Sequence, residues 1–99
     1  MKLHYRQSGG FAGMIRGCAL DTQKLSQSEA KKIEAIAKGC THSPGLSEAS
    51  GRDLIRYELE ICVGDQRPFQ ILADDATITA ELAPLIEVLD RYAKPIPIS

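Results

Sequence analysis

Alternating apolar and polar residues near the start of the chain predict two β-strands. Leu3 and Tyr5 alternate with charged and polar residues across positions 2–7, which is the two-residue period of a half-exposed strand. Positions 14–21 predict a second strand, and we expect the two strands to pair in an antiparallel hairpin. The connection at 8–13 is longer than the two-residue turns of tight hairpins, so we expect it to protrude from the sheet.

The following segment has the spacing of an amphipathic helix. Ser26 can cap its first turn, and Glu29 stands three residues later, where its carboxylate can return a bond to the Ser26 amide. Gly39 ends the helix. The apolar stripe, which we expect to lie across one face of the sheet, consists of Ala30, Ile33, Ile36 and Ala37.

The clearest alternation in the protein predicts two further strands. Positions 54–63 alternate throughout, and we place this strand at the centre of the sheet. Positions 67–72 predict the returning strand, with Phe69 and Ile71 facing inward. Because Pro68 has no backbone donor, this strand is expected to have an edge there or to begin pairing only after it.

A second amphipathic helix is predicted near the end of the chain. Thr79 is its predicted cap, and Asp74 and Asp75 are expected to precede it and to favour its positive end. The tail at 94–99 contains two prolines and should be extended or loose. The apolar positions of the helix are Leu82, Leu85, Ile86 and Leu89.

These elements predict a single α+β domain over residues 1–99. The expected order is strand, strand, helix, strand, strand, helix. The economical arrangement is a four-stranded antiparallel sheet with both helices packed on one face.

Composition narrows the classes of partner. The chain has a formal net charge of −1 and few aromatic residues, so it lacks the basic, aromatic surface that binds nucleic acid. No apolar run approaches the ~20 residues of a membrane span, and the first residues lack the apolar core of a signal peptide. We therefore expect a cytoplasmic protein that has no nucleic-acid or membrane partner and is a monomer when free.

The chain lacks a recognisable catalytic or metal-binding set. His4 and His42 fall in different segments with no carboxylate or cysteine at ligand spacing. Cys18, Cys40 and Cys62 are widely spaced and odd in number, so we expect free thiols. We therefore predict no catalytic residue, cofactor or metal, and favour a binding module over an enzyme.

Two segments stand out as candidate binding loops. The segment 8–13, here called the glycine loop, has three glycines and a lone phenylalanine. The segment 40–53, here called the long loop, is rich in serine, proline and glycine and has no periodicity. Loops displayed on a rigid scaffold commonly carry function, and long loops without secondary structure are otherwise uncommon.

Three short motifs carry a resemblance to a known family. They are Ser8-Gly9-Gly10-Phe11-Ala12-Gly13, Gly51-Arg52-Asp53 and Tyr57-Glu58-Leu59. With a strand on each side of the first motif, this order resembles the emfourin family from Met1 to about Tyr92. Emfourins are small bacterial proteins that inhibit thermolysin-like zinc metalloproteases, among them protealysin.

The resemblance implies that the chain inhibits such a protease through its loops. The target cleft has a pocket that prefers large apolar side chains, and Phe11 is our candidate for that pocket, with the glycines allowing close backbone approach. Alternatively, Phe11 tucks against the sheet and only shapes its loop, in which case the long loop makes the contact. The candidate contact residues are Ser8, Gly9, Gly10, Phe11, Ala12, Gly13, Leu46, Arg52 and Asp53.

Two other classes of function stay open from the sequence. The chain could be a small regulatory or assembly module that binds another protein through an exposed strand edge or a loop. It could also be an enzyme whose site forms between subunits of an oligomer.

Overall fold

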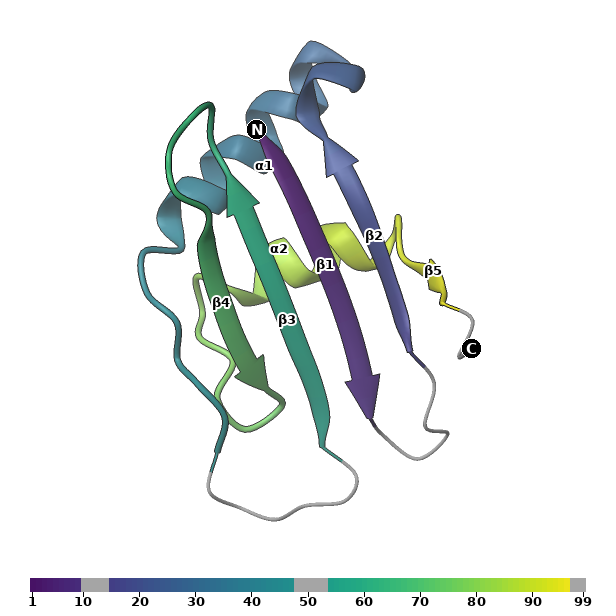
Figure 1. Ribbon diagram of the computed structural model, residues 1–99, viewed down its shortest axis with the longest axis vertical. Helices are drawn as coiled ribbons and strands as arrows, with labels where there is room; N and C mark the ends of the chain where they lie inside the picture. Colours follow the sequence, from purple (N-terminus) through teal and green to yellow (C-terminus); the bar gives the residue numbers. More distant parts are fainter. Residues whose placement is uncertain (10–14, 48–53, 97–99) are drawn as a thin grey trace.

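The computed structural model describes residues 1–9, 15–47 and 54–96 and forms a five-stranded antiparallel sheet with two helices (Figure 1). The strands lie side by side in the order β4-β3-β1-β2-β5. The elements are β1 (Lys2–Gly9), β2 (Arg16–Asp21), a 3-10 helix η1 (Thr22–Lys24), α1 (Gln27–Gly39), β3 (Ile55–Cys62), β4 (Phe69–Asp74), α2 (Ala83–Asp90) and β5 (Lys94–Pro95).

The predicted α+β class is confirmed, but the prediction of four strands is wrong. The tail is not loose at its start: Lys94 and Pro95 form β5, which pairs with Gly17 and Arg16 of β2. The Ile96 amide donates to the carbonyl of Ile15 at 2.8 Å and extends this pairing. The centre of the sheet is β1 rather than β3, because β1 has β3 and β4 on one side and β2 and β5 on the other.

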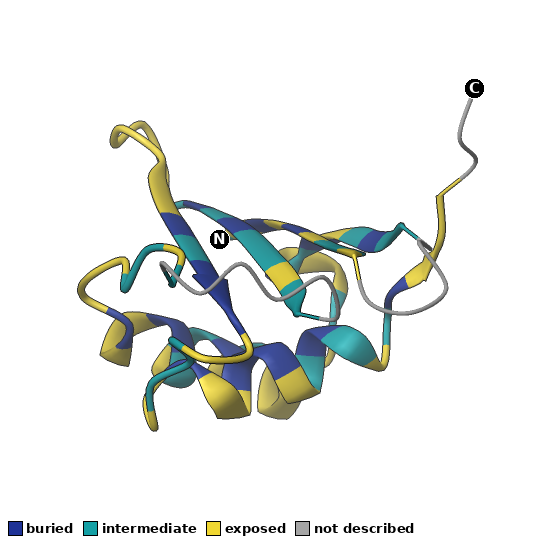
Figure 2. Ribbon diagram, turned by 90° about the horizontal axis from the view of Figure 1, so that it is seen from below, coloured by how far each residue is buried: buried dark blue, intermediate teal, exposed yellow. Residues whose placement is uncertain are grey.

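The core lies between one face of the sheet and the two helices (Figure 2). Alternate residues of each strand point into it, as the two-residue period requires. The helices cover this face with the apolar stripes that the sequence predicts. The largest fully buried side chains are Leu3, Thr22, Ile33, Leu85 and Leu89.

The helix ends follow local sequence signals. Ser26 caps α1, and its hydroxyl accepts from the Glu29 amide at 3.3 Å. Gly39 is the last residue of α1, as predicted. Thr79 accepts from the Leu82 amide at 3.2 Å, so it caps a turn that leads into α2, which itself begins at Ala83.

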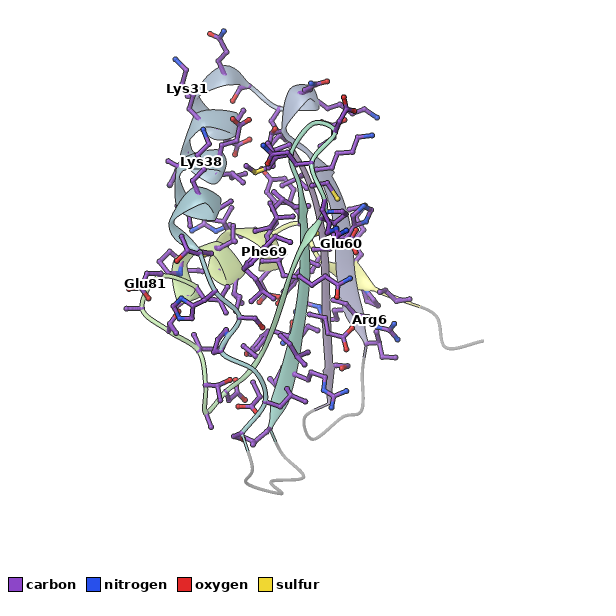
Figure 3. The ribbon with its side chains drawn as sticks, turned by 60° about the vertical axis from the view of Figure 1, so that its left-hand side comes forward. Arg6, Lys31, Lys38, Glu60, Phe69 and Glu81 are labelled. Atoms are coloured by element: carbon purple, nitrogen blue, oxygen red, sulfur yellow. The ribbon has the colours of Figure 1, made fainter. Side chains whose placement is uncertain are left out.

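The β3–β4 hairpin forms with one departure from expectation. Pairing begins at Phe69, directly after Pro68, as predicted. The strand β4 lies at the edge of the sheet. Phe69 pairs with Ile61 and lies on the helix side of the sheet (Figure 3), yet 37% of its surface is exposed. Its inward position therefore does not bury it, because it lies at the end of the strand.

Among the described residues, no helix is both long and apolar enough to span a membrane.

Candidate functional site

Both candidate loops attach to the same end of the sheet (Figure 1). Gly9, the last residue of β1, is the register partner of Ile55, the first residue of β3. The glycine loop therefore begins beside the residue at which the long loop returns to the sheet. Ser8 and Gly9 are themselves part of β1, so this strand runs two residues further than predicted. The other candidates, Gly10 to Gly13, Arg52 and Asp53, lie outside the described residues.

Gly9 is required where the two loops meet. Its φ of 90° lies in the left-handed region that favours glycine, and an added Cβ would lie 2.9 Å from the carbonyl oxygen of Leu54. The absence of a side chain thus lets the end of β1 approach the backbone that leads into β3. This contact fixes the start of one loop against the end of the other.

Asp74 holds the other side of the long loop. Its Oδ2 accepts from both the amide and the hydroxyl of Ser47 at 2.8 Å, and its Oδ1 accepts from the Ala76 amide at 2.8 Å. The Gly45 amide donates to the carbonyl of Leu72 at 2.7 Å. Leu46 is therefore held between two fixed residues while 37% of its surface stays exposed, which suits an apolar contact residue.

Asp75 holds the returning end of the long loop. Its Oδ2 accepts from the Ile55 amide at 3.0 Å, and its own amide donates to the Ile55 carbonyl at 3.2 Å. Its Oδ1 accepts from the hydroxyl of Tyr57 at 2.8 Å. Burial, together with the bond to this carboxylate and its negative charge, raises the pKa of Tyr57, so the phenol stays a donor.

The prediction that Asp74 and Asp75 favour the positive end of α2 is therefore wrong. Asp74 ends β4 and Asp75 follows it, eight residues or more before α2 begins at Ala83, so neither lies at the positive end of that helix. Together they clamp the chain at Ser47, within the long loop, and at Ile55, two residues after its end. The sequence contains a signal for this role, which is two adjacent carboxylates at the end of a predicted strand. The neighbouring residues do not indicate that Ser47 and Ile55, which are distant in sequence, lie opposite them.

The clamp at Asp74 should persist in moderately acidic solution. Bonds from the Ser47 amide and hydroxyl and from Ala76 and Thr77 lower the pKa of this carboxyl below its ordinary 3.8 and outweigh its burial. A lowered pKa contributes stability that is fully present above the ordinary value and is lost as the pH falls through the folded value. An NMR titration of the side-chain carboxyl carbon should have its midpoint below 3.8; a midpoint above that value would contradict the assignment.

The sheet face away from the helices is open and polar. Arg6 and Glu60 project from it, on the side opposite the helices (Figure 3). A broad groove of about 830 Å³ runs over it. Arg6 lies opposite Glu58 and His4 opposite Glu60, so basic and acidic residues of neighbouring strands alternate in sign, as on a solvated sheet face.

The histidines, cysteines and acidic residues are the groups that could form a metal site or a reactive thiol. Among the described residues, no three His, Cys, Asp or Glu side chains lie close enough to hold a metal ion. Cys18, Cys40 and Cys62 are free, as predicted, and burial raises the pKa of each thiol. They therefore remain protonated and weakly nucleophilic at neutral pH.

The edges of the sheet are covered at several positions. On β4, the Ser43 hydroxyl accepts a hydrogen bond from the Leu72 amide at 2.8 Å, and the Gly45 amide donates one to the Leu72 carbonyl. On β2, β5 pairs with Arg16 and Gly17. Covered edges of this kind resist the addition of a strand from another chain.

Comparison with known proteins gives one family. The emfourin family model matches residues 5–90, a range that includes both candidate loops and the residues that clamp them. No curated protein and no solved structure matches the chain.

Proposed function

The chain belongs to the emfourin family, and we propose that it inhibits thermolysin-like zinc metalloproteases by placing its two loops in the enzyme's active-site cleft. The observation that carries this proposal is the family match, which spans the glycine loop and the Gly51-Arg52-Asp53 motif. The paired ends of the loops at Gly9 and Ile55 support a single contact surface.

The proposed contact combines an apolar anchor with a second, polar loop. Phe11 enters the enzyme pocket that accepts large apolar side chains, and the glycines around it let the backbone come close. Leu46, Arg52 and Asp53 of the long loop contact the rim of the cleft. A loop held by paired strands at both ends loses little freedom on binding and resists productive cleavage.

The proposed inhibitor is not an enzyme. The inhibitor acts without catalytic residues, metal or cofactor of its own, and it is a cytoplasmic monomer until it meets the protease.

Titration against a protease tests the proposed function. Increasing amounts of the purified protein are added to a fixed amount of thermolysin or protealysin, and residual peptidase activity is measured. We expect activity to disappear near one equivalent and the inhibitor to remain uncleaved on a gel after incubation. Full activity at a large excess would contradict the proposal and favour the assembly module, which should be inert in this assay.

A further inference from the structure

We propose that Asp74 and Asp75 are positioning residues of the inhibitor, which hold Ser47 within the long loop and Ile55 just after it in place before the protease binds. This inference rests on the proposed function and gives the two aspartates no contact with the enzyme. Their effect on inhibition passes through Ser47 and Ile55.

The geometry ties Ser47, within the long loop, and Ile55, two residues after its end, to one point of the sheet. Asp74 accepts two hydrogen bonds from Ser47, on the side where the chain leaves the β4 edge. Asp75 exchanges two with Ile55, where the chain enters β3. Because the aspartates are consecutive, their Cα atoms are about 3.8 Å apart, which brings the two loop ends together.

The clamp also reaches the glycine loop. Ile55 lies between Asp75 on one side and Gly9 on the other, and Gly9 ends β1. Gly9 also approaches the Leu54 carbonyl closely, because a Cβ added to Gly9 would lie 2.9 Å from that oxygen. A change at Asp75 should therefore disturb the placement of both loops.

Tyr57 fixes the orientation of the clamp from the helix side of the sheet. Its hydroxyl donates to Asp75 Oδ1 at 2.8 Å, which leaves Oδ2 directed at the Ile55 amide. Both oxygens of this exposed carboxylate are thus used to hold β3. The Asp75 side chain accepts two hydrogen bonds at the surface, one at each oxygen, although it contributes nothing to the core.

Loop ordering before binding raises affinity. A loop with free ends must be ordered when the complex forms, and the free energy of that ordering is subtracted from the affinity. With its ends held by charge-assisted hydrogen bonds, the loop avoids part of this loss. Loss of the clamp should therefore weaken inhibition while the core remains intact.

Asp75→Ala tests the clamp directly. It removes both acceptors at an exposed position, and we expect the inhibition constant to rise about tenfold, the equivalent of one charge-assisted hydrogen bond. The Ile55 amide of the free protein should exchange its hydrogen about tenfold faster for the same reason. Asp75→Asn keeps an acceptor for Ile55 and offers a donor to the Tyr57 oxygen but loses the charge, so it should weaken inhibition less than Asp75→Ala does.

Two controls separate positioning from general stability. Asp65→Ala removes an exposed aspartate from the turn between β3 and β4, at the opposite end of the sheet, and should leave inhibition unchanged. Ile33→Val slightly destabilises the core beneath α1 without touching the clamp. This variant should have a lower melting temperature than the wild type but the same inhibition constant.

These measurements distinguish failure of the clamp from failure of the proposed inhibition. If the wild type inhibits and Asp75→Ala inhibits equally well, the clamp has no positioning role, but the proposed function stands. If Asp75→Ala weakens inhibition but leaves the hydrogen exchange of the Ile55 amide unchanged, the loss does not pass through Ile55, and the inference is overturned. A wild type that does not inhibit overturns both, whereas the exchange rate of Ile55 still reports whether Asp75 holds β3.

Discussion

Phe11→Ala is expected to weaken inhibition of a thermolysin-like protease about thirtyfold or more. A buried aromatic anchor contributes ~2 kcal/mol or more at an interface, and each 1.4 kcal/mol changes the dissociation constant tenfold. Gly9, the last residue of β1, is the register partner of Ile55, the first residue of β3. The measurement is the inhibition constant from progress curves with a peptide substrate.

Phe69→Ala is the matched control for this prediction. Phe69 is the other phenylalanine of the chain, with 37% of its surface accessible, and it begins β4 at the end of the sheet opposite the loops. We expect this variant to inhibit like the wild type. If Phe11→Ala also inhibits like the wild type, Phe11 only shapes its loop, and the contact moves to Leu46, Arg52 and Asp53.

Gly17→Ala is expected to destabilise the protein by about 2–3 kcal/mol, which would lower its melting temperature by roughly 10–20 °C. An added Cβ would overlap the carbonyl oxygen of Tyr5 and lie 3.0 Å from Ile96 Cδ1. The Tyr5 oxygen belongs to the backbone of the central strand and cannot rotate away. The chain must therefore shift where β1, β2 and β5 meet, and thermal and urea unfolding would measure the loss.

Gly39→Ala serves as the control for the glycine substitution. Gly39 is the last residue of α1, and a Cβ there would meet nothing within 4 Å. Alanine should therefore be neutral or slightly stabilising, because it restricts the unfolded chain. Equal stability of the Gly17→Ala and Gly39→Ala variants would show that β2 can move away from β1 without loss, contrary to the close approach described above.

Local patterns predicted most of the secondary structure. The alternation around Leu3 and Tyr5 and around Leu59 and Ile61 marks strands whose inward residues are buried in the structure. The Ser26 cap and Gly39 mark the two ends of α1 within one residue. These signals suffice because each depends on interactions between residues that are close in the sequence.

The candidate site was predicted only as two separate loops. The glycines and the lone phenylalanine marked one loop, and the lack of periodicity marked the other, but neither pattern states that they share one end of the sheet. That follows from the pairing of Gly9 with Ile55, across more than forty residues of chain. The role of Asp74 and Asp75 was missed for the same reason, since their partners are distant in sequence.

The sequence by itself determined the α+β class, the positions of the first four strands and both helices, and the two segments able to bind a partner. Only the tertiary structure decided that Lys94 and Pro95 add a fifth strand, that β1 is central, and that the aspartates clamp the long loop. The physical reason is that periodicity and capping act over a few residues. Strand order, edge pairing and side-chain clamps depend instead on which distant backbone groups meet when the core closes.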